Sequence, residues 1–388
     1  MVFMLIDRKD PNSFFKPYYD ILPETLSNMP IFWSAEELQS LKGSYLLDQI
    51  DERNAAIEID YETICNVVPH FRSYATLQEF KWARMCVCSR NFGLVINGLQ
   101  TAALVPYADM LNHYRPRETK WQFDDELQSF TVIALQHITA GAQVYDSYGK
   151  KCNHRFLLNY GFSVENNIEA DGSCPNEVPL LLELHPSDPL YDVKVTYYRR
   201  DLSTSSRRVR VSIGENDGSK TVFALLRLIE ADAEDFDLLI ASAGSSLYRS
   251  IRDAMIPISL DNELKVLKQL LFLCDNYLSK YPTSLEDDVH RLIHGNVEMF
   301  SNERNALIQV KGEKEVLHFY RDMALTGIKL LQARDHDDFD RQLNEVRANK
   351  HSMVFQYARS SLARVLQEEL RRGDRQRKKL DLTKPTIV

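Results

Sequence analysis

The amino-acid sequence predicts an α+β protein in which a β-rich core follows a helical segment and precedes a mostly α-helical C-terminal domain. Helices are predicted early in the chain because Ser34 and Thr76 each begin a capping-box pattern ahead of apolar residues at helical spacing. After Gly98 the pattern changes to short apolar runs separated by turns, which favour strands. Beyond Thr221, amphipathic stretches follow one another almost to the end. With 388 residues, the chain is long enough for two domains.

The first part of the chain is expected to be mainly helical. Residues 1–6 have the pattern of the last turns of a helix that residues 10–12 end. The aromatic-rich run 12–23 predicts a helix packed against the core. The helix that starts after Thr76 is expected to end within residues 89–93, where Gly93 can supply the stop, because glycine readily takes the left-handed conformation that ends helices.

Two polar segments of the β-rich part are expected to meet. The first, 105–113, carries Asp109, Asn112 and His113 and predicts a tight, non-helical turn. The second is 145–149. Alternating apolar residues and a glycine-containing turn lie between them. This pattern predicts a short β-meander that brings the two polar segments together.

The C-terminal half is predicted to be a helical bundle preceded by two strands. Strand-like runs occupy 178–184 and 209–213, after a linker at 171–175. The amphipathic stretches have no fixed repeat length, which favours a bundle over a solenoid. They are residues 222–231, 260–277, 285–300 and 305–333. The basic run from Arg371 to Lys379 is expected to be solvated.

Charge and cysteine content argue against several functions. A net charge of −8 and a pI near 5.8 argue against nucleic-acid binding, which usually requires a concentrated basic face. The six cysteines form no CxxC pair, so neither a disulfide framework nor a zinc site is expected. No apolar run approaches the roughly 20 residues of a membrane span. We expect a monomer located in the cytoplasm, the nucleus or both.

Common catalytic motifs are missing from the sequence. There is neither a GxSxG nucleophile motif nor a phosphate-binding GxxxxGK[ST] motif. His290 and His294 have the spacing of metal ligands on a helix, but Arg291 stands where a metalloprotease needs Glu, so we expect no metal there. The first polar segment has two interpretations. It is either a turn whose short polar side chains satisfy the local backbone, or part of a site that the second polar segment completes.

Considered together, the two polar segments resemble the C-terminal half of a SET domain. The motifs are Val105–His113 (VPYADMLNH), Asp146–Gly149 (DSYG), Asn153 and Tyr160–Phe162 (YGF). Their order and spacing are similar to those of the Rubisco large-subunit methyltransferase (LSMT) class. The resemblance implies a helical SET insertion in 1–97, the C-terminal half of the SET domain in 98–167, a substrate-binding domain in 176–335 and a helical, basic tail in 336–388. Members of the class begin with a glycine-rich SET segment, which we expect to be missing ahead of the insertion.

The resemblance implies a protein methyltransferase whose cofactor is S-adenosyl-L-methionine and which needs no metal. Tyr148 would be its catalytic residue. The implied cofactor-binding residues are Arg90, Asp109, Asn112, His113, Tyr148 and Phe162. The implied substrate-binding residues are Phe92, Ala108, Tyr145 and Ser147. Methyl transfer requires a neutral amine in line with the methyl group, and an apolar channel lowers the pKa of a lysine from its usual value of about 10.4.

The resemblance favours lysine as the target, on a histone or non-histone protein that docks on the C-terminal helical domain. In the actin-histidine branch of the class, Asn and Trp occupy the positions of Phe92 and Ala108. Two alternatives stay open: a protein-histidine methyltransferase of the actin type, and a catalytically impaired SET-like module that binds a protein partner. A helical scaffold without enzymatic ancestry would not explain the cluster of Asn112, His113 and Tyr148.

Overall fold

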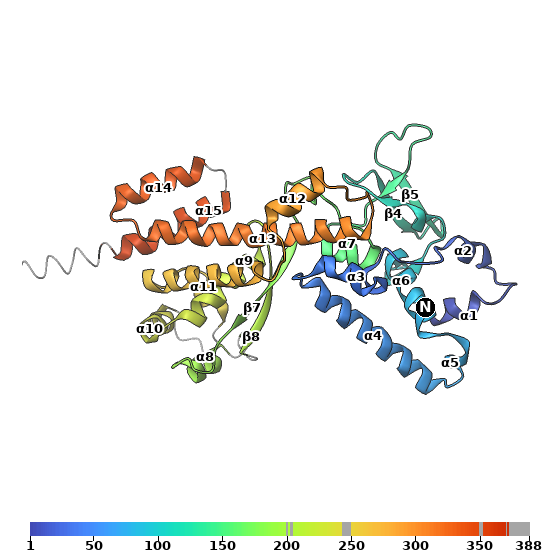
Figure 1. The fold of residues 1–388 in the computed structure, drawn as a ribbon, viewed down its shortest axis with the longest axis horizontal. Coiled ribbons are helices and arrows are strands. Elements are labelled where there is room, and N and C mark those ends of the chain that lie inside the picture. Colours follow the sequence, from blue (N-terminus) through green and yellow to red (C-terminus); the bar gives the residue numbers. More distant parts are fainter. Residues whose placement is uncertain (199–200, 202–204, 243–249, 349–351, 370, 372–388) are drawn as a thin grey trace, which may run out of the picture. The chain divides into compact units, whose positions relative to one another are not determined.

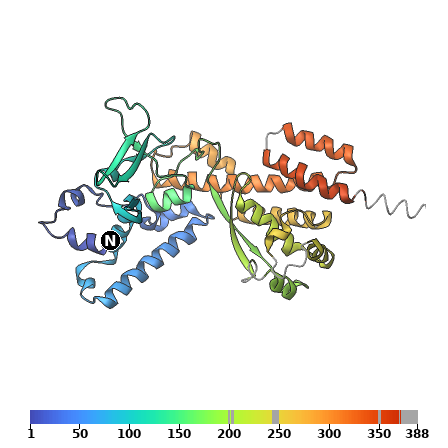
Figure 2. The same cartoon turned by 180° about the vertical axis from the view of Figure 1, so that it is seen from behind.

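The computed structural model describes residues 1–198, 201, 205–242, 250–348, 352–369 and 371. They form two compact units (Figures 1 and 2). The first unit is Met1–Asn176 with Thr283–Gly312, and the second is Glu177–Pro282 with Glu313–Val388. Helices and short sheets are present in both, so the predicted α+β class is confirmed. The domain boundaries expected from the sequence stay a prediction.

Helices are the main secondary structure of the first unit. Its α-helices are α1 (Val2–Asp7), α2 (Lys16–Ile21), α3 (Ala35–Leu38), α4 (Leu46–Val67), α5 (Phe71–Tyr74), α6 (Leu77–Arg90), α7 (Asn153–Tyr160) and α12 (Leu285–His294). Its 3₁₀ helices are η1 (Pro30–Phe32), η2 (Gln39–Leu41) and η3 (Ala108–Met110). Leu46 and Ile50 of α4 are buried, as are Phe80 and Met85 of α6. The aromatic-rich run forms α2 as predicted, and Tyr18 and Tyr19 are buried there.

Both predicted capping boxes are confirmed. The Ser34 hydroxyl accepts from the backbone N–H of Glu37 and starts α3, and the Thr76 hydroxyl accepts from the backbone N–H of Glu79 and starts α6. The predicted end of α6 within residues 89–93 is confirmed, but Gly93 does not supply the stop. The helix stops at Arg90, because the Asn91 side-chain amide donates to the carbonyl of Val87 at 2.6 Å and its backbone is extended.

Three strand pairs follow α6. The hairpins are β1 (Asn91–Ile96) with β2 (Leu99–Leu104) and β4 (Thr119–Asp124) with β5 (Ser129–Ala134). The third pair joins β3 (Asn112–His113) to β6 (Tyr145–Asp146) in parallel. Asn112 lies opposite Tyr145, and His113 lies opposite Asp146. The predicted meeting of the two polar segments is therefore confirmed. Strand structure begins at Asn91, before the change in pattern at Gly98.

The prediction of a tight, non-helical turn at 105–113 is wrong. Asp109 lies in the 3₁₀ helix η3, and Asn112 and His113 form β3. The reason is long-range pairing with β6, which a local reading of turn-forming residues does not detect. The chain changes direction sharply just before η3, at Tyr107, whose φ is +70°.

The second unit joins a long β-hairpin to a set of helices. Its strands are β7 (Glu177–Glu183) and β8 (Ser206–Ser212), which confirm the two predicted strands. Its helices are α8 (Tyr191–Tyr197), α9 (Asp217–Glu230), α10 (Ala233–Ser242), η4 (Ile251–Ala254), α11 (Leu260–Leu278), α14 (His336–Ala348), α15 (Ser352–Tyr357) and the π-helix η5 (Ala358–Leu362). The long helix α13 (Asn302–Leu331, orange in Figure 1) starts in the first unit and ends in the second.

The helix α9 packs closely on β8. A Cβ atom on Gly218, in the first turn of α9, would lie 2.0 Å from the carbonyl oxygen of Arg210 in β8, so only glycine fits there. The predicted helix 285–300 is too long, since α12 stops before the extended residue Gly295. Among the described helices, none combines the length and the hydropathy that crossing a bilayer requires. The basic run beyond Arg371 lies outside the described residues.

Candidate active site

Two adjoining cavities lie in the first unit. The larger has a volume of about 880 Å³ and is lined by Asn112 and His113 of β3, Tyr145 of β6 and Phe162 after α7. Residues between 299 and 308, which precede and begin α13, also line it. Its size lies within the range of roughly 300–1,000 Å³ that is typical of small-molecule sites.

The smaller cavity has a volume of about 200 Å³ and shares part of its wall with the larger one. The shared residues are Ser89, Arg90, Asp109, Tyr148 and Tyr160. The residues that line only the smaller cavity include Phe92, Ala108, Trp121, Asp146, Ser147 and Lys151. A volume of this size holds several water molecules. The smaller cavity therefore has room for a single side chain.

The strand β6 supplies one residue to each cavity. Tyr145 lines the larger cavity, and Asp146, the next residue, lines the smaller one. Successive side chains of a strand point to opposite faces, which explains the alternation. Tyr148 follows two residues later and lines both cavities.

Asp109 and Arg90 form a buried ion pair in the shared wall. The Asp109 side chain is fully buried, and its Oδ2 accepts from Arg90 Nη1 at 3.2 Å and from the Tyr18 hydroxyl at 2.8 Å. Arg90 Nη1 also donates to the backbone carbonyl of Asp109 at 3.1 Å. Burial and the hydrogen bond to Asp109 raise the pKa of Tyr18, so this phenol stays protonated. All of these contacts of Arg90 use one nitrogen, and a guanidinium has five N–H donors, so Arg90 can also bind an anionic group in the cavity.

His113 is held as a neutral imidazole. Its Nδ1 accepts a hydrogen bond from the backbone N–H of Tyr148 at 3.0 Å, so the proton of the neutral ring is on Nε2. Burial lowers the pKa of His113 to about 4, and the charges of Arg115 and Lys151 contribute. The Nε2 atom is buried and has no hydrogen-bond partner among the described residues, and the same is true of Asp109 Oδ1. Buried polar atoms without partners are costly, so both atoms are suited to a ligand.

The Tyr148 hydroxyl has a fixed position. It donates to the backbone carbonyl of Leu111 at 2.9 Å, and its ring stacks on Tyr160 with 4.8 Å between centroids. Burial raises the pKa of Tyr148 to about 12. The phenol is therefore neutral near pH 7, and it can orient a neighbouring group by hydrogen bonding without acting as a strong base.

Aromatic rings form one wall beside His113. Phe162 lies 5.9 Å from the His113 ring and stacks on Phe156 at 5.1 Å between centroids. Phe156 itself lies 4.9 Å from His113. Because Phe162 also lines the larger cavity, this wall can pack against a planar ring system.

Contacts at both ends fix the position of the helix α7. Asn153, at its start, donates from its side chain to the carbonyl of Val164 at 3.0 Å and accepts from the Val164 N–H at 2.9 Å. At its other end Gly161 has a φ of +78°, and a Cβ there would lie 2.2 Å from Nδ2 of Asn28. Gly161 therefore needs both its left-handed backbone and its missing side chain. The two ends together fix the positions of Tyr160 and Phe162.

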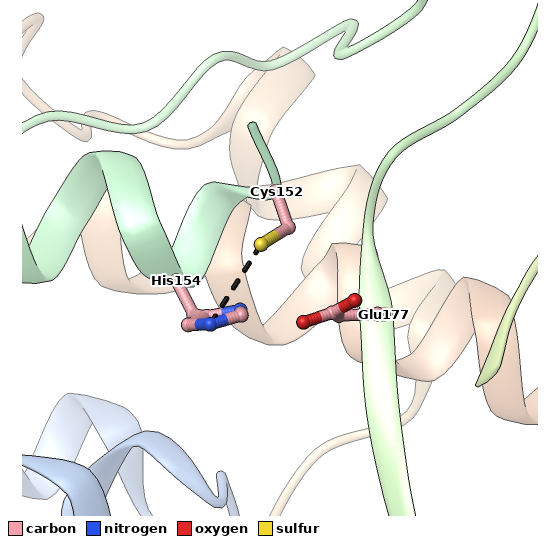
Figure 3. Close-up of side chains that lie close together, drawn as sticks. All are labelled: Cys152, His154 and Glu177. Atoms are coloured by element: carbon pink, nitrogen blue, oxygen red, sulfur yellow. Dashed lines mark hydrogen bonds between the residues drawn. The ribbon is translucent and has the colours of Figure 1, made fainter. Parts of the chain in front are cut away.

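Contacts of Cys152 and His154 also hold the start of α7 in place (Figure 3). The Cys152 sulfur lies 3.7 Å from Nε2 of His154, and Nδ1 of His154 lies 2.6 Å from the Tyr45 hydroxyl. Both side chains are buried. His290 and His294 are exposed on α12, in agreement with the expectation that they lie on a helix surface.

The structure brings all ten predicted site residues to the two cavities. Asn112, His113, Tyr145 and Phe162 line the larger one, Phe92, Ala108 and Ser147 line the smaller one, and Arg90, Asp109 and Tyr148 line both. Tyr145 and Phe92 were both predicted to bind the substrate, but Tyr145 lines the larger cavity and Phe92 lines the smaller one. No role was predicted from the sequence for Tyr18, Trp121, Asp146, Lys151 or Tyr160. The role of Asp146 could have been predicted from the sequence, because successive side chains of a strand point to opposite faces and Asp146 directly follows Tyr145.

Comparisons with known proteins agree with this geometry. Residues 185–317 match the family model described as Rubisco LSMT substrate-binding. The mouse (Mus musculus) actin-histidine N-methyltransferase is 26% identical over 326 residues, which cover 81% of this chain and 53% of that protein. The chloroplastic [fructose-bisphosphate aldolase]-lysine N-methyltransferase of Arabidopsis thaliana is 26% identical over 364 residues, which cover 85% of this chain and 72% of that protein. The chain thus spans about half the length of the actin-histidine relatives.

Solved structures show the same fold. The SET domain of LSMT bound to methyllysine and AdoHcy matches with a TM-score of 0.69 and 25% identity, over 89% of this chain and 78% of that one. Rubisco LSMT bound to sinefungin and monomethyllysine matches with a TM-score of 0.70 and 26% identity, over 88% and 77% of the two chains. The resemblance seen in the sequence is confirmed. The chain has the fold of the LSMT SET-domain structures, and its residues 185–317 match the Rubisco LSMT substrate-binding family.

Proposed function

We propose that this chain is an S-adenosylmethionine-dependent protein-lysine N-methyltransferase. The observation that supports the proposal is the pair of cavities with a common wall at Tyr148, because methyl transfer needs a cofactor and a target that meet at one point. Relatives named as lysine and histidine N-methyltransferases, and LSMT structures that contain AdoMet or AdoHcy, support the same activity.

In this proposal the cofactor binds in the larger cavity. The Arg90 guanidinium suits its carboxylate, and the two buried atoms without partners, His113 Nε2 and Asp109 Oδ1, offer one donor and one acceptor. Asn112 adds an amide, and Phe162 packs against the adenine. The residues present therefore fit the cofactor, which when bound supplies a methyl group on a sulfonium sulfur.

The chain's own residues orient the reaction. A target amine enters the smaller cavity, and the fixed Tyr148 hydroxyl lies at the wall between the two cavities. With the cofactor held beside Arg90, Asp109 and His113, its sulfonium would supply the methyl group to the lone pair of this amine. The amine must lose its proton to water before the transfer, because only the neutral amine has a free lone pair. Catalysis would then come mainly from positioning.

Lysine is favoured over histidine as the target. Phe92 packs edge-on against Trp121 at 5.1 Å and against Phe130 at 5.0 Å, so an aromatic ring occupies the position of the amide expected for an imidazole pocket. Ala108 leaves space where the histidine-specific pattern has a large ring. A long, flexible lysine side chain suits this narrow cavity.

Radiolabelled methyl transfer into a proteome of the source organism tests the proposal. The Tyr148→Phe variant is expected to lose roughly 100-fold in rate, because misplacing the reacting groups by about 1 Å has an effect of that size. It should still bind S-adenosylmethionine, measured by isothermal titration calorimetry. Tyr74→Phe is the matched control, since Tyr74 lines neither cavity and its hydroxyl contacts Ile6. No binding at millimolar cofactor would favour the impaired interaction module.

The choice of target residue has its own test. Phe92→Asn is expected to reduce lysine methylation, because it replaces an aromatic wall of the smaller cavity by an amide. Amino-acid analysis of the labelled product identifies the methylated residue. Labelled 3-methylhistidine from the wild type, or lysine turnover unchanged in Phe92→Asn, would contradict the assignment to lysine.

A further inference from the structure

Asp146 is a buried carboxylate in the wall of the smaller cavity. Only 4% of its surface is exposed, and its Oδ1 atom has no hydrogen-bond partner of ordinary geometry among the described residues. Its backbone carbonyl accepts from the Tyr114 N–H at 2.9 Å, and it is fixed in β6 opposite His113. The backbone therefore holds this carboxylate in place beside the cavity.

The cations near Asp146 are held elsewhere. Arg90 pairs with Asp109, Lys151 Nζ donates to the backbone carbonyl of Tyr148, and Arg117 donates to the carbonyl of Ser147 at 3.4 Å. Within the described part of the chain, Asp146 takes part in no ion pair shorter than 4 Å. Burial raises its pKa, an effect that the Ser147 N–H, Arg117 and the Trp121 indole partly offset. These groups balance part of the charge, while Oδ1 is buried without a hydrogen-bond partner of ordinary geometry.

The rest of the lining also suits a cation. Phe92 and Trp121 lie in the same wall, and Tyr148 and Tyr160 close the cavity toward the larger one. Aromatic faces attract ammonium groups, and a desolvated cation binds well only where an opposite charge is at hand. A cavity lined by one carboxylate and four aromatic residues offers both features.

We propose that Asp146 recognises the target amine, by pairing its free Oδ1 with the ammonium group of a lysine that enters the smaller cavity as a cation. This inference rests on the proposed function and names the residue that selects its substrate. Asp146 is a positioning residue: it admits the charged side chain and holds its nitrogen near Tyr148, while Phe92 and Trp121 enclose the alkyl chain. A neutral side chain of the same length would find no partner for the carboxylate.

Binding of free L-lysine, measured by titration calorimetry or ligand-observed NMR with and without S-adenosylhomocysteine, tests the inference without a known target protein. Norleucine has the same chain length without the amine and serves as the neutral comparison. Wild-type protein is expected to bind lysine at least 10-fold more tightly than norleucine. Asp146→Asn, which keeps the shape but removes the charge, should lose that preference. Asp51→Asn, at an exposed carboxylate of α4, is the control.

The outcomes separate the two proposals. Equal affinity of the wild type for lysine and norleucine, or unchanged lysine affinity in Asp146→Asn, would overturn the role of Asp146 and leave the methyltransferase proposal intact. Absence of S-adenosylhomocysteine binding by the wild type would count against the methyltransferase proposal instead. If circular dichroism shows that Asp146→Asn does not fold, the affinities of the wild type for lysine and norleucine still test the role of Asp146. In turnover, Asp146→Asn should raise KM for the target more than it lowers kcat.

Discussion

At the scale of single residues, the site depends on protonation states that the surrounding backbone fixes. The Tyr148 N–H donates to His113 Nδ1, and the Tyr148 hydroxyl donates to the carbonyl of Leu111. One residue thereby sets the tautomer of the imidazole and is itself held by the strand-forming segment before it. The residue types at these positions were evident from the sequence. The tautomer of the imidazole and the buried atoms without hydrogen-bond partners could not be predicted from the sequence, because they follow from contacts between distant segments.

The depressed pKa of His113 predicts a pH-dependent stability. The pKa is about 4 in the folded protein, and in the unfolded chain it is about 6.5. The unfolded state therefore binds more protons between these values, so the stability from this group is present above pH 6.5 and is lost as the pH falls toward 4. His113→Asn keeps an acceptor for the Tyr148 N–H and removes the titration. Its unfolding free energy, from urea titrations, should fall less steeply in this window than that of the wild type.

The control for this prediction is His137→Asn, since His137 is exposed. That variant should follow the wild-type pH dependence. Equal slopes for the wild type and His113→Asn between pH 4 and 6.5 would show that the imidazole does not titrate as the buried geometry requires.

At the scale of elements, the end of α7 limits what the site tolerates. Gly161→Ala places an L-residue in the left-handed region, at a cost of about 1–2 kcal/mol, and brings its Cβ against Asn28. Crowding of a packed site adds roughly 1–3 kcal/mol. The variant should therefore have a lower urea midpoint than Gly172→Ala, which has a φ of +80° but open space around it. Asn28→Ala in the Gly161→Ala background should recover the difference, and a lack of recovery would contradict the crowding.

The elements differ in how far local sequence could predict them. Capping boxes at Ser34 and Thr76 predicted helix starts correctly, because a cap is made by residues three apart in the chain. The residue that ends α6 and the strand β3 were mispredicted. Asn91 pairs with Leu104 and His113 pairs with Asp146, and such distant partners decide the conformation of segments whose local composition favours turns. The site residues were found through a motif that spans these segments, whereas Asp146 and Trp121 required the cavity itself.

At the scale of the whole molecule, the two units offer separate probes of stability. In the second unit, Arg227 donates to both carboxylate oxygens of Glu263 at 2.7 Å, and both side chains are buried. Glu263→Gln leaves the guanidinium without its counter-charge, at a cost of about 3–5 kcal/mol. The three tryptophans, Trp33, Trp82 and Trp121, all lie in the first unit. Far-UV circular dichroism should therefore show an earlier transition in this variant, while the tryptophan fluorescence transition stays in place.

An exposed ion pair provides the comparison for this experiment. Lys265 pairs with Asp232 at 2.9 Å on the surface of the same unit, and Lys265→Met should cost less than about 1 kcal/mol. A fluorescence transition that moves together with the circular dichroism transition in Glu263→Gln would show that the two units unfold as one cooperative body.

The shared wall of the two cavities has a thermodynamic consequence. Arg90, Asp109 and Tyr148 line both cavities, so a molecule that orders these side chains in one cavity changes the free energy of binding in the other. Such linkage is reciprocal: whatever factor the first ligand applies to the affinity of the second, the second applies to the first. A protein built in this way would take up its second substrate most readily once the first is in place, and would release both products more easily after either has left.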